Sequence, residues 1–309
     1  MKIYKLNINS RFSEKNLNLT IGNFDGIHLG HQDVINQLIE NSKKNKYQSS
    51  LLSFSPHPRK FFEYSNDNFN IITKKCKKKF LEKLGLQIYI DFEFNSALAS
   101  LSPEDFIKKI LIEKLNIKKI IVGEDFKYGK DRKGNLQLLQ AKAKEFSFDL
   151  KIIKTIIDKK NNQKYSSSII RENIKNGKFE NVGQSLGRNW QMSGKIILGD
   201  RRARKINFPT ANIEPDEHIL PPRGVYNVYA ILNNKKYEAI ANFGERPTFG
   251  DSKLLLETHI FDFDKDIYGK ELTVEFLTFI RKEQKFDNFE KLTEQIKKDI
   301  KTAKNYHRI

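Results

Sequence analysis

Residues 20–31 read TIGNFDGIHLGH, and this stretch decides the fold of the first half of the chain. It leaves an apolar run, turns through three glycines and enters a helical pattern, as a strand–turn–helix unit does. Amides at a helix N-terminus favour anions, so this turn can hold a phosphate group. His28 and His31 are three residues apart and can both face that phosphate, where they would stabilise charge developing on an attacked phosphorus. Gly30 between them would let a nucleotide approach the backbone closely.

Strand and helix patterns alternate on both sides of this turn. The expected strands are 17–22, 50–54, 86–92, 118–123 and 149–157, and the expected helices are 31–41, 74–84, 103–115 and 135–146. Ser102 as N-cap and Pro103 in the first helical position mark the start of the third helix. This alternation predicts an α/β fold, with a doubly wound parallel sheet over residues 1–182. Ligands of such sheets bind outside the carboxyl ends of the strands.

The pattern changes after a short helix expected at 168–176 and a domain boundary expected near 182–189. Runs rich in β-forming residues follow at 192–198, 225–232, 237–243, 254–261 and 272–280. Their spacing predicts a small antiparallel β-barrel over residues 183–309. A single helix, capped near Asp287 or Asn288, is expected to close the chain.

Composition excludes several classes of protein. The chain has 309 residues, 38% of them hydrophobic, and no apolar run of 18 residues, so we expect no membrane span. Its start lacks the apolar stretch of a signal peptide and its one cysteine, Cys76, cannot form an internal disulfide, which favours a cytoplasmic location. The net charge of +18 is dispersed, with its densest run at 74–79. We expect a solvated surface that attracts anionic nucleotides, and no nucleic-acid partner.

Four further segments carry polar or aromatic side chains where strands or helices begin and end. The prolines of FSPHP (54–58) would hold a rigid loop that presents His57. GEDFKYG (123–129) follows an expected strand, and SSSIIR (166–171) places hydroxyls and a bidentate anion donor at a helix start. In ARKINFPTAN (203–212), Thr210 and Asn212 offer oxygen ligands for Mg²⁺ on ATP phosphates. The chain has no G-x-x-x-x-G-K-[ST] loop, so a kinase here would be of another type.

Together these segments resemble the bifunctional riboflavin kinase/FMN adenylyltransferase family, the bacterial FAD synthetases, over nearly the whole chain. The H-x-G-H core is shared with other nucleotidyltransferases and with class I tRNA synthetases. The GNFDG sequence at 22–26 makes the resemblance specific to this family. Tyr128 and Ser168 replace a Phe and a Thr of the family pattern. The resemblance implies a nucleotidyltransferase domain at 1–182 and a riboflavin kinase barrel at 183–309. It also implies two reactions: phosphorylation of riboflavin to FMN by ATP, and adenylylation of FMN to FAD with release of pyrophosphate.

The resemblance also assigns residues to roles. The catalytic residues would be His28, His31 and Glu257, the last as general base for the riboflavin 5′-hydroxyl. Residues that would bind nucleotide or phosphate are Gly22, Asn23, Phe24, Asp25, Gly30, Ser167, Ser168, Arg171, Gly199, Thr210 and Asn212. Residues that would bind flavin are His57, Pro58, Asp125, Phe126, Tyr128, Arg246 and Thr248. Mg²⁺ would enter with ATP on Thr210 and Asn212. The expected partners are ATP, riboflavin and FMN, bound by a monomer or weak homo-oligomer.

Two departures keep other readings open. Ala203 and Asn207 stand where the family has glycine, and an L-residue in a left-handed conformation costs about 1–2 kcal/mol. An FAD synthetase with a weakened or lost kinase half is therefore one alternative. A basic RNA-binding protein built on a nucleotidyltransferase scaffold is another. A related transferase, acting on nicotinate mononucleotide or phosphopantetheine, would lack the barrel, and a tRNA synthetase would need an anticodon-binding region.

Overall fold

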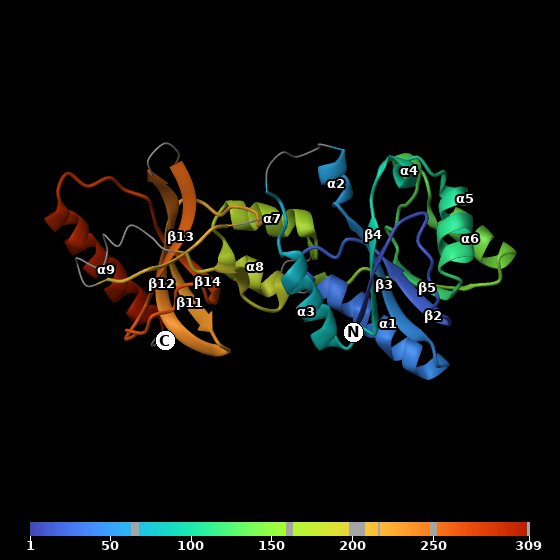
Figure 1. Ribbon diagram of the computed structural model, residues 1–309, viewed down its shortest axis with the longest axis horizontal. Coiled ribbons are helices and arrows are strands. Elements are labelled where there is room, and N and C mark those ends of the chain that lie inside the picture. The colour runs from blue at the N-terminus through green and yellow to red at the C-terminus, as the bar shows by residue number, and fades with distance from the viewer. Residues whose placement is uncertain (63–67, 159–162, 198–207, 216, 248–251, 308–309) are drawn as a thin grey trace. The chain divides into compact units, whose positions relative to one another are not determined.

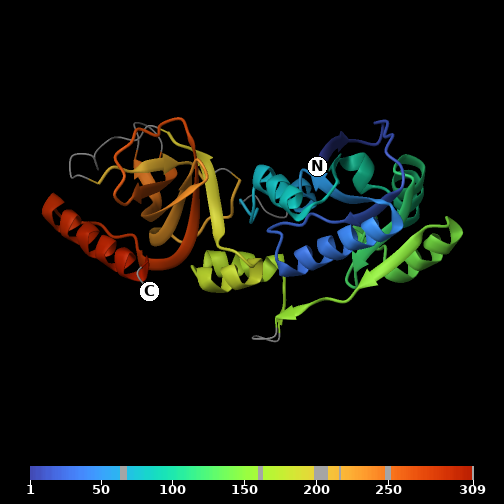
Figure 2. The same cartoon turned by 90° about the horizontal axis from the view of Figure 1, so that it is seen from below.

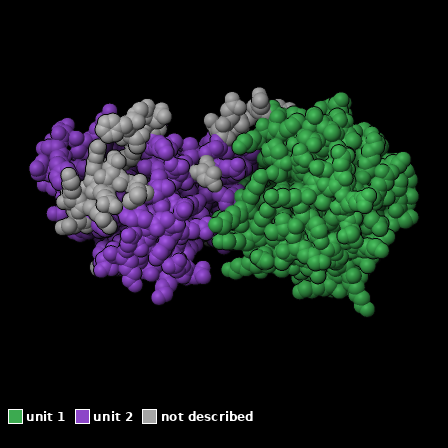
Figure 3. All heavy atoms as spheres, in the orientation of Figure 1, with its two compact units in different colours: residues 1–66, 74–166 green, residues 67–73, 167–309 purple. Residues whose placement is uncertain are grey.

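The computed structural model describes residues 1–62, 68–158, 163–197, 208–215, 217–247 and 252–307 (Figure 1). The chain forms two compact units, coloured separately in Figure 3. The first comprises Met1–Asn66 and Lys74–Ser166, and the second comprises Asp67–Thr73 and Ser167–Ile309. A functional boundary at residue 182 remains a prediction, since packing groups the helices that follow Ser166 with the second unit.

The first unit is built on a six-stranded, fully parallel sheet. Its strands are β1 (Lys2–Leu6), β2 (Leu17–Ile21), β3 (Gln48–Ser55), β4 (Ile88–Glu93), β5 (Ile117–Gly123) and β6 (Asp149–Ile153), in the order β1-β4-β3-β2-β5-β6. The expected doubly wound sheet is confirmed. Strand β1 was not expected, because a short edge strand with exposed charges has no clear apolar alternation. The run expected at 149–157 ends at Ile153, and a separate two-stranded ribbon of β7 (Ile157–Asp158) and β8 (Gln163–Lys164) follows.

Helices cover both faces of this sheet (Figure 1). Helices α1 (Leu29–Asn45) and α3 (Lys74–Leu84) pack on one face, where Leu38 and Leu81 join Leu51 of β3 in one buried cluster. On the other face lie α5 (Pro103–Asp105), its π-helical continuation η1 (Phe106–Lys114) and α6 (Leu136–Glu145). Short turns α2 (Pro58–Phe61), α4 (Ser96–Ala99) and η2 (Lys130–Arg132) connect these elements. The expected cap is present, since Ser102 Oγ accepts the amide of Asp105 at 3.0 Å.

The strand order reverses direction between β2 and β5. From β2 the chain adds β3 and β4 on one side, and then crosses to add β5 and β6 on the other. Such a switch point separates the loops that follow the two central strands and leaves a crevice at their carboxyl ends. The turn at 22–28 follows β2, and the segment at 123–129 follows β5. The two motifs singled out in the sequence therefore start at the same switch point.

The second unit contains a six-stranded antiparallel sheet, as expected. Its strands are β9 (Trp190–Lys195), β10 (Ala211–Ile213), β11 (Gly224–Leu232), β12 (Lys235–Pro247), β13 (Ser252–Ile260) and β14 (Glu271–Lys282), in the order β10-β13-β12-β11-β14-β9. A bridge between Ile197 and Asn212 brings the chain after β9 back to β10, which closes the sheet into a small barrel. Gly194 permits this approach, because a Cβ there would lie 3.2 Å from the Cβ of Ile213.

The described part of the second unit also contains the helices α7 (Ser167–Lys175), α8 (Phe179–Leu186) and α9 (Phe289–His307) (Figure 2). The sequence placed a boundary at 182–189, but α8 occupies much of that range and buries Phe179 against Trp190 and Phe276. Ile71 belongs to the same core, and the Trp190 indole N–H donates to its carbonyl at 2.8 Å. A segment from the first half of the sequence thus helps to build the second unit.

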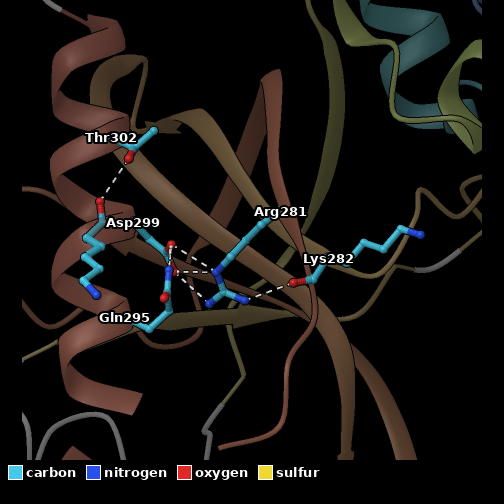
Figure 4. A network of polar contacts seen from close by, with 6 residues as sticks. Arg281, Lys282, Gln295, Asp299 and Thr302 are labelled. Atoms are coloured by element: carbon cyan, nitrogen blue, oxygen red, sulfur yellow. Dashed lines mark hydrogen bonds and ion pairs between the residues drawn. The ribbon is translucent and has the colours of Figure 1, made fainter. Parts of the chain in front are cut away.

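Helix α9 is fixed to the barrel by a buried ion pair (Figure 4). Arg281 of β14 donates to both carboxylate oxygens of Asp299, at 3.0 and 2.7 Å, and the Gln295 amide donates to the same carboxylate at 2.8 Å. Asp299 is only 4% exposed. A bidentate guanidinium–carboxylate pair has well-defined geometry, so it fixes the position of the helix along the sheet.

We expect Asp299→Ala to lower the free energy of unfolding by about 3 kcal/mol, because it leaves the Arg281 guanidinium partly buried without its counter-ion. Asp287→Ala is the matched control. Asp287 forms an ion pair with Lys291, but both side chains are well exposed, so its loss should change stability by less than about 1 kcal/mol. Denaturant unfolding of the full chain measures both changes, and equal midpoints would contradict the expectation.

Candidate nucleotide and flavin sites

His28 is the residue around which the β2–α1 turn is organised. It is the N-cap of α1, and its Nδ1 accepts the backbone amide of His31 at 3.2 Å. Because Nδ1 is the acceptor, the ring proton lies on Nε2, which is then a hydrogen-bond donor. The two imidazoles stack with centroids 3.6 Å apart and an interplanar angle of 17°. The expected pairing of these two residues at the helix start is therefore present.

The turn is tightly packed around these rings. Phe24 lies against His31, with ring centroids 4.8 Å apart. A Cβ on Gly22 would lie 3.0 Å from the Phe24 ring, and one on Gly30 would lie 3.2 Å from the His28 ring. The sequence suggested that Gly30 admits a nucleotide, whereas in the structure the space beside it holds the His28 imidazole. A contact of Gly30 with nucleotide stays a prediction.

The backbone of the turn adopts left-handed conformations at Phe24, Gly26 and Ile27, with φ of 48°, 84° and 43°. Such values are unfavourable for Phe and Ile, so surrounding contacts must hold the turn in place. Asp25 is buried inside it, at 7% exposure. The side-chain oxygen of Asn23 is also buried, and it has no hydrogen-bond partner in the described part of the chain. A buried oxygen of this kind is suited to a ligand donor or a cation.

Lys77 of α3 is a residue that the sequence analysis missed. Its Nζ donates to the carbonyl of Asn23 at 3.1 Å and to Ser53 Oγ of β3 at 3.2 Å. It belongs to the lysine run at 74–79, which the sequence analysis assigned to solvated surface. Only its helical position, one turn from the buried Leu81, could have indicated that it points inward.

Aromatic side chains gather at the carboxyl ends of β3 and β4. His57 caps α2 through Nδ1, which accepts the amide of Arg59 at 3.1 Å, and Pro58 occupies the first turn. Phe61 and Phe62 both meet Phe94 edge to face, with centroids 5.2 and 5.8 Å away. Phe62 is 46% exposed. The expected flavin segment therefore presents an accessible aromatic surface, which the sequence analysis did not identify.

The segment after β5 divides into an exposed and a buried part. Asp125 is exposed and pairs with Lys164 at 2.6 Å. Phe126 stacks on Tyr128 at 5.3 Å, and Tyr128 also contacts Phe106 of the core. Burial raises the pKa of the Tyr128 phenol. Of the expected flavin residues here, Asp125 is open to solvent and Tyr128 is part of the hydrophobic core.

Ser167, Ser168 and Arg171 lie at the start of α7, in the second unit. The Arg171 Nε donates to the carbonyl of Phe69 at 2.8 Å, and the guanidinium lies 5.4 Å from the Phe69 ring centroid. Arg171 therefore holds Phe69 within the second unit. Binding of phosphate by these three residues stays a prediction.

A row of polar residues crosses the antiparallel sheet. Asn212 of β10 lies opposite Glu257 of β13, which lies opposite Asn242 of β12. The row continues through Val225 of β11 to Arg281 of β14. Residues directly opposite each other on neighbouring strands point to the same face of the sheet. Val225 packs in a small hydrophobic cluster with Ala303 of α9. The row therefore lies on the face of the sheet that α9 covers. Glu257 is 9% exposed, and the buried side-chain oxygen of Asn212 has no partner among the described residues.

His259, to which the sequence analysis gave no role, contacts the two residues that precede Thr210. The His259 Nδ1 lies 2.9 Å from the carbonyl of Pro209, and its ring meets Phe208 at 5.6 Å. Burial is the main cause that lowers the pKa of His259. Because His259 is two residues after Glu257, both side chains point to the same face. This i, i+2 spacing was the signal that could have identified it.

Some expected residues cannot be placed. Gly199, Ala203, Asn207 and Thr248 lie outside the described residues, as does the side chain of Arg246. In the part of the chain that is described, no group of three or more His, Cys, Asp or Glu side chains is placed to hold a metal ion. None of the described helices is long and apolar enough to cross a membrane.

A doubly wound sheet with paired imidazoles at its switch point, joined to a small barrel with a glutamate in a polar row, defines a two-domain nucleotide-dependent transferase. A family model for FAD synthetase matches residues 11–169, and a family model for riboflavin kinase matches residues 186–307. The chain belongs to the bifunctional riboflavin kinase/FMN adenylyltransferase family, and it carries both of the family's enzyme domains.

Curated relatives agree over almost the full length. Bifunctional riboflavin kinase/FMN adenylyltransferases from Buchnera aphidicola and Haemophilus influenzae are 38% and 37% identical, and the alignments cover 99% and 93% of each chain. The enzyme from Bacillus subtilis is 36% identical over 93% of this chain and 92% of its own. A Streptococcus pneumoniae crystal structure, titled as a macrolide-efflux protein, has a TM-score of 0.87 and 28% identity over 99% of both chains.

We expect Gly30→Ala to slow FMN adenylylation by about 10-fold or more, because the new Cβ would displace the His28 ring by several tenths of an ångström. Gly183→Ala in α8 is the matched control. Its Cβ would meet its nearest neighbour at 3.7 Å, which is an ordinary contact, so activity should be unchanged. Steady-state FAD formation from supplied FMN compares the two variants. Equal rates would show that the His28 position is not critical.

Proposed function

We propose that the β2–α1 turn is the site of adenylyl transfer to FMN, and that the Asn212–Glu257 row is the site of phosphoryl transfer to riboflavin. The observation that carries the first assignment is the stacked His28–His31 pair at the N-terminus of α1, at the switch point of the sheet. Helix amides and imidazole donors at this place favour bound phosphate. The second assignment depends on the buried carboxylate of Glu257 opposite Asn212, whose buried side-chain oxygen has no partner in the described ranges of the chain.

In the first unit, a phosphate oxygen of FMN attacks the α-phosphorus of ATP, and the bond to the bridging oxygen of pyrophosphate breaks. The FMN phosphate is already ionised, so no protein base is required. His28 Nε2–H and the His31 imidazole would donate to the oxygens that gain charge. Ser167, Ser168 and Arg171 belong to the second unit, and binding of phosphate by these residues stays an expectation from the family resemblance.

The flavin ring needs an aromatic surface near this turn. The exposed Phe62 and its neighbours Phe61 and Phe94 lie at the carboxyl ends of β3 and β4, next to His57 and Pro58. Offset or edge-to-face contacts with such a cluster stabilise a bound aromatic ring. Phe126 and Asp125, which follow β5 beside the switch point, would contact the same ligand.

In the second unit, Glu257 would remove the proton of the riboflavin 5′-hydroxyl as that oxygen attacks the γ-phosphorus of ATP, with ADP as the leaving group. The donor set fits Mg²⁺, since the buried oxygen of Asn212 and the Thr210 hydroxyl are hard oxygen ligands. When bound with ATP, Mg²⁺ would neutralise phosphate charge. His259 would keep Thr210 in place through Pro209.

The remaining assignments follow from the same proposal. We expect the enzyme to act in the cytoplasm as a monomer or weak homo-oligomer, on ATP, riboflavin and FMN and without nucleic acid. The riboflavin kinase match at 186–307 spans Ala203 and Asn207, so the reading with a lost kinase half is not favoured. The RNA-binding reading is not favoured either, because both enzyme domains are present.

We expect Glu257→Gln to abolish FMN formation from riboflavin while FAD formation from supplied FMN continues, because the amide keeps the shape but cannot accept the proton. Glu275→Gln, on β14 of the same sheet, is the matched control and should retain both activities. Chromatographic separation of FMN and FAD, after incubation with riboflavin, ATP and Mg²⁺, measures both steps. Unchanged FMN formation in Glu257→Gln would refute the role of this residue.

We expect His31→Ala to slow FAD formation by about 10²–10³-fold, since a donor to the developing charge is lost. Its riboflavin kinase rate should equal that of the unmodified protein, which provides an internal control for folding. Near-normal FAD formation would remove His31 from the catalytic residues.

A further inference from the structure

Lys77 connects three elements of the first unit. It lies on α3, and its ammonium donates to the carbonyl of Asn23 in the β2–α1 turn and to Ser53 Oγ of β3, at 3.1 and 3.2 Å. The Tyr89 ring of β4 is 5.7 Å from the ammonium, in the range of a cation–π contact. The ammonium therefore bridges the turn to the sheet.

Charged groups of the turn, of β4 and of α3 itself act on this ammonium, whereas β3 contributes the uncharged Ser53 hydroxyl. Asp25 of the turn and Asp91 of β4 attract it, whereas Lys74 and Lys78 of its own helix repel it. Burial is the largest influence and lowers the pKa of Lys77 to about 8, against an ordinary value of 10.5. Burial also raises the pKa of the Tyr89 phenol, which stays protonated. Lys77 is therefore mostly charged at neutral pH, and it loses its proton as the pH rises through about 8.

Other hydrogen bonds also hold the turn, such as the one that Gln32 Nε2 of α1 donates to the carbonyl of Ile27 at 2.9 Å. Within the turn, the amide of Ile27 donates to the carbonyl of Phe24 at 3.3 Å. At its start, the amide of Gly22 donates to the carbonyl of Leu52 in β3 at 3.0 Å. Phe24 and Ile27 have unfavourable left-handed conformations, which persist only where surrounding structure holds them. The carbonyl of Asn23 lies between these two hydrogen bonds in the sequence, and Lys77 fixes it.

We propose that Lys77 is a positioning residue for adenylyl transfer, and that its ammonium holds the 22–28 turn in the conformation that binds ATP. It acts through Asn23, whose side-chain oxygen is buried and has no partner among the described residues. A shift of the Asn23 carbonyl would also move Phe24, which packs on the catalytic His31. This inference depends on the turn being the adenylyl-transfer site.

The test compares Lys77→Met, Lys77→Arg and the control Lys78→Met in the full chain. Lys78 lies on the same helix and 5.6 Å from the same Tyr89 ring, but its ion-pair partner is Asp91 at 4.0 Å. We expect Lys77→Met to lower kcat/KM for ATP in FMN adenylylation by about 10- to 100-fold. Lys78→Met should change it by less than about 3-fold, and riboflavin kinase rates should be equal in all three variants.

The pH profile separates positioning from a purely structural role. In the unmodified protein, kcat/KM for ATP should fall as the pH rises through about 8, because this parameter reports the free enzyme. Arginine keeps its charge, so Lys77→Arg should retain activity at higher pH. The same alkaline fall in Lys77→Arg would overturn the proposal, even if Lys77→Met does not fold. Equal kcat/KM in Lys77→Met and Lys78→Met would also overturn it.

His31→Ala in the same series distinguishes the two levels of inference. If His31→Ala slows FAD formation and Lys77→Met does not, the site stands and the role of Lys77 fails. If His31→Ala forms FAD at the normal rate, the assignment of the turn fails, and the proposal for Lys77 fails with it.

Discussion

The hydrogen bond from the His31 amide to Nδ1 of His28 is the interaction on which the first site depends. It starts α1, and it fixes the proton of His28 on Nε2, where it can be donated to a ligand. It also sets the ring against His31, in a space that a side chain on Gly30 would narrow. His28 therefore caps the helix that follows β2 and also supplies a hydrogen-bond donor at the switch point.

The second site is built in a different way. Its polar row depends on the register of antiparallel strands, because a shift of one residue would turn Glu257 and Asn212 toward the hydrophobic interior. The short strand β10 (Ala211–Ile213) carries Asn212, and the bridge to Ile197 holds it in place. The Arg281–Asp299 pair then keeps α9 over the same face. The first site uses a helix terminus and backbone strain, whereas the second uses sheet register and closure.

Much of the fold could be predicted, because its signals are local. The alternation of strand and helix patterns identified the two sheets, and Ser102 followed by Pro103 identified the cap. Elements whose stability comes from distant contacts were missed. Strand β1 depends on pairing with β4, β10 on closure of the barrel, and α8 on packing against Trp190. Strands β1 and β10 are too short to show a clear pattern, whereas α8 was missed although Phe179, Val182 and Leu186 have the spacing of one helical face.

The sequence by itself determined the strand–turn–helix unit, the chemical types at both sites and the family, since each is written in neighbouring residues. Only the tertiary structure decided that Lys77 leaves a run of surface lysines to hold the Asn23 carbonyl, and that residues 67–73 pack in the second unit. Whether a charge is buried or solvated depends on what the rest of the chain brings beside it. The sequence around a lysine does not show which distant residues the fold will place beside it.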